Sequence, residues 1–117
     1  MKKVLVSALL VFCSSSALAQ QCVDIYQARK ALNTYLSPLV GQIPSQDFPW
    51  LEQDRDANPL SDLDVKKALS TLKWNNKKLV YETSSVVGGY CAPAAEAWGW
   101  YAVDCGGNVA AQEACED

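Results

Sequence analysis

Apolar residues recur at intervals of three and four along residues 22–40, and this spacing predicts an amphipathic helix. Ile25, Leu32 and Leu36 fall on one face of that helix, while polar side chains occupy the opposite face. Gly41 follows the apolar stretch, at a position where glycine commonly ends a helix. The first element after the N-terminal region is therefore predicted to be helical.

A second helix is predicted over residues 62–74. Ser61 is a suitable N-cap, and Asp64 stands three residues later, where an acidic side chain can return a hydrogen bond to the cap. Val65 and Leu72 belong to an apolar stripe along one side of this segment. Local capping chemistry and periodicity agree on this element.

The C-terminal third is harder to assign. Residues 77–87 fit a strand and a helical stripe equally well, and helix is preferred because an isolated hairpin is rarely stable. Pro93 suits the first turn of a helix that reaches Cys105, and Asn108 suits the cap of a last short helix ending at Cys115. The predicted fold class is mainly α, a small domain of four to five helices.

The N-terminal residues 1–19 carry the pattern of a secretory signal peptide. Basic residues are followed by a short apolar run and by Ala17-Leu18-Ala19, a small-residue cleavage pattern. Lipidation at Cys13 is the alternative, although the bulky Phe12 precedes it. The organisation expected is a signal peptide over 1–19 and a single disulfide-stabilised helical domain over 20–117.

Four cysteines remain after signal removal: Cys22, Cys91, Cys105 and Cys115. An even number in a small exported chain predicts two disulfides, which places the protein in the periplasm or outside the cell. Zinc sites bring cysteines in close pairs, and no such pair occurs here. Three pairings can be drawn, and the sequence does not choose between them.

The chain contains no histidine, and this excludes several chemistries. Ser-His-Asp and Cys-His nucleophile systems need an imidazole, and so do His-ligated metal sites. Removal of residues 1–19 leaves eight basic and thirteen acidic residues, a net charge of −5. Nucleic acids and anionic membranes demand clustered Lys and Arg, so neither is expected as a partner. We predict no enzymatic activity and no cofactor.

Two alternative hypotheses concern the aromatic C-terminal third of the chain: a transmembrane span and a glycan-cleaving site. A transmembrane span over residues 84–103 has the right length, but Pro93 and Glu96 interrupt its hydrophobicity. Carboxylates could serve a glycan-cleaving site beside aromatic side chains that stack on a sugar. The residues concerned are Glu82, Glu96 and Asp104 with Trp98, Trp100 and Tyr101. We expect surface charges beside core aromatics instead.

Residues 42–60 contain three prolines and many polar side chains, and they are predicted to form a loop. Tryptophan is favoured at protein–protein contacts, and acidic neighbours steer a protein toward a basic partner. The predicted partner-binding residues are Phe48, Trp50, Asp54, Asp56 and Asp62. For the apolar side chains of this loop, packing over the edge of the core is the preferred interpretation, and an exposed binding anchor is the alternative.

The same loop resembles the start of a calcium-binding loop, with oxygen ligands at alternate positions from Asp54 to Asn58. Pro59 and Val65 stand where such a loop needs glycine and glutamate. No metal is therefore predicted.

These observations predict a small exported binding protein without catalytic activity. Its concrete form is a periplasmic inhibitor or immunity protein that neutralises another protein, one with a basic surface. The alternative is a structural or stress-related envelope protein, holdase-like, without a single partner.

Overall fold

The computed structural model describes residues 22–116, so the predicted signal peptide and Cys13 lie outside the described residues. Residues 22–116 form a five-stranded antiparallel sheet with two short α-helices, which makes this part of the chain mainly β. The elements are α3 (Ile25–Leu36), η1 (Ser37–Leu39), η2 (Pro49–Gln53), α4 (Asp62–Thr71), β1 (Lys73–Asn75), β2 (Val80–Glu82), β3 (Val87–Ala92), β4 (Ala95–Val103) and β5 (Val109–Glu116). The expected mainly α class is wrong.

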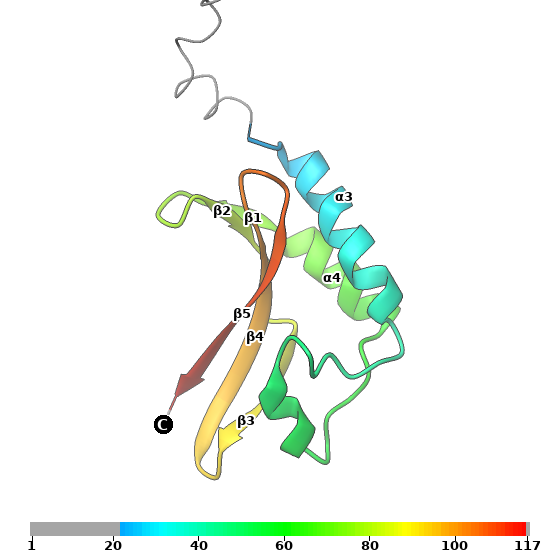
Figure 1. Cartoon of the computed structure of the whole chain (residues 1–117), viewed down its shortest axis with the longest axis vertical. Helices are drawn as coiled ribbons and strands as arrows, with labels where there is room; N and C mark the ends of the chain where they lie inside the picture. Colours follow the sequence, from blue (N-terminus) through cyan, green and yellow to red (C-terminus); the bar gives the residue numbers. More distant parts are fainter. Residues whose placement is uncertain (1–21, 117) are drawn as a thin grey trace, which may run out of the picture.

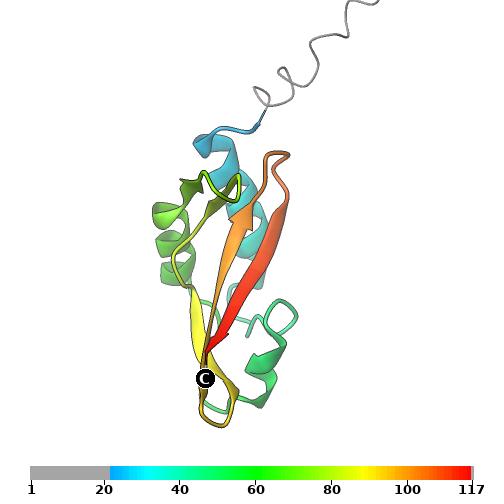
Figure 2. The same ribbon diagram turned by 90° about the vertical axis from the view of Figure 1, so that its left-hand side faces the viewer.

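Strand β4 is the centre of the sheet. β5 pairs with it along one edge, in continuous register from Glu96↔Glu116 to Val103↔Val109. β2 and β3 follow each other along the other edge of β4, and β1 pairs with β2. Figures 1 and 2 show α3 and α4 on the same side of this sheet.

The two helices expected over 22–40 and 62–74 are confirmed with shorter bounds, because α3 ends at Leu36 and α4 at Thr71, and residues 73–74 belong to β1. Asp24 caps α3 and Ser61 caps α4, and each helix has a complete capping box. At α4 the Asp64 backbone N–H donates to Ser61 Oγ over 3.1 Å, and the Asp64 carboxylate accepts from the Ser61 N–H over 2.9 Å. Both caps satisfy backbone groups that would otherwise lack partners at the helix start.

The helices expected over 93–105 and 108–115 are strands β4 and β5 instead, and 77–87 contains β2 and the start of β3. Pro93 lies in the β3–β4 turn rather than in a helical turn. Apolar residues lie on both faces of β4, so the alternation typical of a half-buried strand is weak and the spacing imitates a helical stripe. Residues 84–103 form a hairpin, and within 22–116 neither helix is long and apolar enough to cross a membrane.

The core lies between the sheet and the helices. Its largest fully buried side chains are Tyr101, Phe48, Leu32, Leu36 and Val103. The hydroxyls of Tyr35 and Tyr101 both donate to the Asp47 carboxylate, over 2.8 and 2.9 Å. Burial, followed by this hydrogen bond, raises the pKa of Tyr35 to about 12 and also raises the pKa of Tyr101. The 42–60 segment is thus anchored to both α3 and β4.

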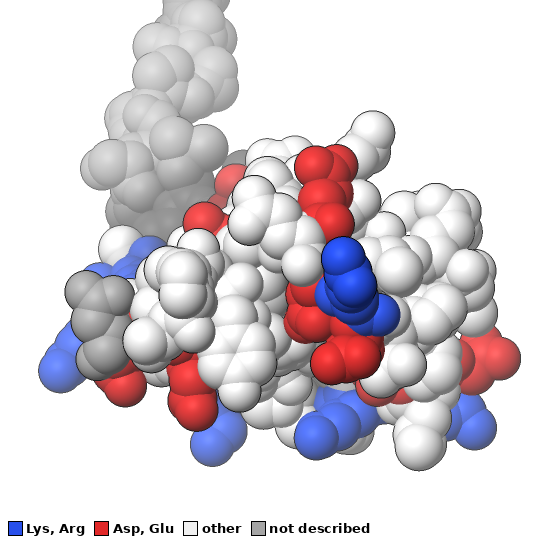
Figure 3. Space-filling view, turned by 90° about the horizontal axis from the view of Figure 1, so that it is seen from below, with Lys and Arg blue, Asp and Glu red and all other residues white. Residues whose placement is uncertain are grey.

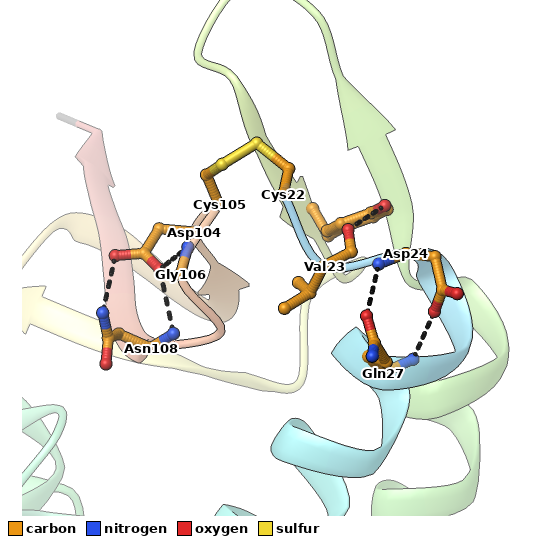
Figure 4. The surroundings of a disulfide bond; sticks show 9 residues. Cys22, Val23, Asp24, Gln27, Asp104, Cys105, Gly106 and Asn108 are labelled. Atoms are coloured by element: carbon orange, nitrogen blue, oxygen red, sulfur yellow. Dashed lines mark hydrogen bonds between the residues drawn. A yellow bond between two sulfur atoms is a disulfide. The ribbon is translucent and has the colours of Figure 1, made fainter. Parts of the chain in front are cut away.

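Two disulfides are present, as predicted, and they join Cys22 to Cys105 and Cys91 to Cys115. The first ties the segment before α3 to the β4–β5 turn (Figure 4). Backbone hydrogen bonding supports it, because the Val23 N–H donates to the Cys105 carbonyl over 3.0 Å. The second joins β3 to β5 on either side of β4. Two disulfides are compatible with an oxidising, exported location.

Candidate functional site

Within residues 22–116, one face of the sheet is covered by neither α3 nor α4. The odd-numbered residues of β4 are buried, whereas Glu96, Trp98 and Trp100 alternate with them on the opposite face. A Cβ added at Gly99 would overlap the Phe48 ring, but one at Gly88 would meet only a carbonyl oxygen at 3.9 Å. Figure 2 looks onto the sheet with both helices behind it. We call the side away from the helices the open face, and it carries Glu82, Tyr90, Glu96, Trp98, Trp100, Gln112 and Glu116.

Aromatic rings dominate the middle of the open face. Trp98 and Trp100 are half-buried, and Tyr90 is 59% exposed. The residues directly opposite Trp98 on the neighbouring strands are Gly88 and Ala114, both too small to cover the indole. The flat rings therefore have small neighbours and a surface on which a ligand can stack.

At one end of the open face, Lys78 contacts both the Glu82 carboxylate and the Trp100 ring. The Lys78 ammonium lies 3.2 Å from Glu82 Oε2 and 5.7 Å from the Trp100 ring centroid. Trp100 Nε1–H and Asn75 Nδ2–H donate to the same carboxylate over 3.2 and 2.8 Å. Burial alone would raise the pKa of Glu82, but these hydrogen bonds and the Lys78 charge together lower it. This end of the face is built to hold a cation.

At the other end two carboxylates face each other without a cation. Glu96 and Glu116 are direct cross-strand partners on β4 and β5, and both are exposed. The ion pair found within residues 22–116 is the one between Lys78 and Glu82, at the far end of the face. Directly opposed like charges destabilise a sheet, so a cation supplied from outside would stabilise this pair.

The partner-binding residues predicted from the loop are not on the open face. Phe48 is fully buried under Gly99, which removes it from any surface in this structure. Trp50 is half-buried and donates its Nε1–H to Glu113 Oε1 over 2.8 Å. Asp54 accepts the Asp56 backbone N–H over 2.9 Å, which is local turn chemistry.

Asp56 and Asp62 are exposed and Asp54 is half-buried. Figure 3 looks at the end of the molecule that carries η2 and the β3–β4 turn, and it shows acidic side chains beside a basic one there. Within the described range, no group of three or more His, Cys, Asp or Glu is placed to hold a metal ion. The loop acids remain a candidate surface separate from the open face.

The three carboxylates considered for glycan cleavage are not brought together. Glu82 is opposite Ala102 on β4, six positions from Glu96, and this corresponds to about 20 Å at roughly 3.4 Å per residue. A glycosidase pair needs about 5–9.5 Å. Asp104 accepts the Gly106 and Asn108 backbone N–H groups over 2.9 Å each in the β4–β5 turn, and the bond from Asn108 lowers its pKa most.

Of the aromatic residues named for sugar stacking, Trp98 and Trp100 lie on the open face, and Tyr101 lies in the core. The sequence signal for the face was the alternation of Glu96, Trp98 and Trp100, which is visible only once the segment is a strand. No family model, curated protein or solved structure matches the chain.

Proposed function

We propose that the chain is an exported, non-enzymatic binding protein that holds a basic protein partner against the open face of its sheet. The periplasmic inhibitor or immunity protein is the concrete form of this function. The observation that carries the proposal is the pair of tryptophans on the sheet face that neither helix of residues 22–116 covers, with acidic residues at both ends. Trp, Tyr and Arg are the residue types that dominate protein–protein hot spots.

The charges favour a partner that presents arginine or lysine. The Lys78 ammonium, held by Glu82 and the Trp100 ring, is an internal example of how this face binds a cation. Glu96 and Glu116 offer a second pair of acceptors beside Trp98. A partner's guanidinium there would relieve the repulsion between the two carboxylates and stack on an indole.

The test is capture of partners from an envelope extract of the source organism by tagged, oxidised residues 20–117. Glu96→Lys reverses a charge on the open face, and Glu52→Lys makes the same net-charge change on exposed η2, away from it. We expect one stoichiometric basic protein with the parent chain and with Glu52→Lys, and its loss with Glu96→Lys. Trp98→Ala should weaken capture in the same direction.

Three outcomes would overturn the proposal. Equal capture by the parent, Glu96→Lys and Trp98→Ala would remove the open face as the interface. Many substoichiometric proteins in place of one would favour the holdase-like alternative. Retention on purified peptidoglycan, without any protein partner, would assign the tryptophans to a glycan.

A further inference from the structure

Along the outer edge of β5, several backbone groups have no hydrogen-bond partner within the described residues 22–116. The Asp104 N–H donates to the Asn108 carbonyl over 3.0 Å at the turn, and the β4–β5 register continues from there without a shift. Because the bonding direction alternates along an antiparallel strand, Val109, Ala111 and Glu113 point their backbone groups away from β4. Within residues 22–116, no hydrogen bond reaches those groups from a turn, a loop or a side chain.

Apart from the charges of Glu113 and Glu116, this edge lacks the features that usually protect one. β5 runs from Val109 to Glu116, longer than the three-residue β1, and it contains no proline, no lysine and no bulge. Exposed edges are normally blunted by such features because an unpaired strand recruits another strand. An edge of this length without proline, lysine or a bulge is suited to accept an added strand whose side chains are not acidic.

A groove runs beside the start of this edge. It has a volume of about 790 Å³ and lies between one side of α3 and the first residues of β5. Its lining residues are Gln27, Lys30, Ala31, Thr34, Tyr35, Gly107, Asn108 and Val109. Figure 1 shows α3 and the upper part of β5 on the same side of the molecule. A strand added to β5 would have this groove for the side chains that point toward α3.

We propose that the β5 edge and the α3 groove bind an extended segment of a protein partner, which adds to the sheet as a sixth strand. The segment supplies backbone N–H and C=O groups to Val109, Ala111 and Glu113, and small apolar side chains at alternate positions fit beside Ala31 and Val109. This site uses the backbone edge of β5 and the α3 groove, and it adjoins the open face without including Glu96, Trp98 or Trp100.

A second copy of the chain is the less suitable occupant. Each mature chain has a net charge of −5, and β5 itself carries Glu113 and Glu116. Pairing two β5 strands would join two chains of like net charge, and a register centred near Ala114 would also oppose these carboxylates. A partner segment without acidic side chains has no such repulsion.

The test uses a phage-displayed library of random linear peptides panned on oxidised residues 20–117. We expect selected peptides with apolar residues at every second position, and shifts of the Val109, Ala111 and Glu113 amide signals on titration. Ala111→Pro removes an outward N–H without removing a bond to β4, so it should weaken binding about tenfold or more. Ala111→Val keeps the N–H and is the matched control.

The groove is tested by a second matched pair on α3. Thr34→Arg fills the groove, while Asn33→Arg places the same charge on the neighbouring exposed position outside its lining. We expect loss of peptide binding with Thr34→Arg alone, and unchanged binding with Glu96→Lys, which isolates this site from the open face. Failure to select peptides, or binding indifferent to Ala111→Pro and Thr34→Arg, would overturn the proposal. So would a dimer in sedimentation that Ala111→Pro dissociates.

Discussion

Two glycines on opposite faces of the sheet give a sharp test of the strand assignment. Gly99 is buried in the middle of β4, and a Cβ built there would overlap the Phe48 ring. Gly88 lies in β3 on the open face, and its Cβ would meet only the Ala97 carbonyl oxygen at 3.9 Å. Both have backbone conformations that alanine can adopt, since the glycines with positive φ are Gly41 and Gly107.

The expected effects have opposite signs. At Gly88, alanine restricts the unfolded chain without a clash, which stabilises a protein by about 0.4–1 kcal/mol. At Gly99, the added methyl overpacks a filled core, which costs about 1–3 kcal/mol. If the segment were the helix that its composition suggested, Gly99→Ala would instead stabilise it by about 1 kcal/mol. The sign of the change in unfolding free energy therefore separates the two folds.

Urea unfolding of the oxidised protein, followed by tryptophan fluorescence and circular dichroism, measures this change. With an m-value of about 1–1.5 kcal/mol/M, a loss of about 2 kcal/mol lowers the midpoint by roughly 1.5 M. Phe48→Leu in the Gly99→Ala background should restore part of the loss, because it removes ring atoms at the contact. A Gly99→Ala protein as stable as the parent, or a Gly88→Ala protein destabilised equally, would refute this packing.

Two further predictions concern the disulfides and the acid side of the pH range. Replacing Cys22 and Cys105 by alanine removes a disulfide between residues 83 apart and should lower the free energy of unfolding by about 4–5 kcal/mol. Replacing Cys91 and Cys115, which are 24 apart, should lower it by about 3–4 kcal/mol. Urea unfolding of the two double variants measures both losses, and a larger loss for the Cys91 and Cys115 variant would contradict the prediction. The pKa of Glu82 is lowered by folding, so its stabilisation is fully present above the unfolded value of about 4.3 and is lost as pH falls through the folded value. The difference in unfolding free energy between the parent and Glu82→Gln should therefore be largest at neutral pH and vanish in strong acid, and a constant difference would contradict it.

The helices could be predicted because their signals are local. Ser61 and Asp64 are three residues apart, and they form the capping box of α4. The apolar stripe with Leu32 and Leu36 lies within one helix, and both side chains are fully buried. The capping box and the apolar stripe can each be recognised without information on the residues that pack against the helix.

The sheet could not be predicted because both faces of its central strand carry large apolar or small residues. On the covered face Tyr101 and Val103 are buried, and on the open face Trp98 and Trp100 stand where a polar residue is usual. The alternation that identifies a half-buried strand is therefore lost, and alanine-rich spacing imitates a helix. The two tryptophans that break the usual alternation, Trp98 and Trp100, are also the centre of the candidate site.

The position of Phe48 depends on a partner far along the chain. A loop with three prolines gives no indication that this ring will lie on Gly99, because that contact requires β4 to exist first. For the same reason the sequence does not predict the free edge of β5. Which of its backbone N–H groups point outward depends on the register with β4. Binding surfaces of this kind arise from the pairing of the strands, and no local sequence motif marks them.

The two proposed surfaces are contiguous through β5. Gln112 points its side chain to the open face beside Trp100, and the neighbouring residues Ala111 and Glu113 point their backbone groups to the free edge. A strand added at that edge would extend the open face by one strand, and this strand would lie about 4.8 Å beyond β5 on the side away from Trp100. The side chains of such a strand would alternate between the α3 groove and the acidic, aromatic face. Because β5 lies between the added strand and Glu96 on β4, the segment itself would not contact Glu96, and Glu96→Lys therefore tests the open face alone.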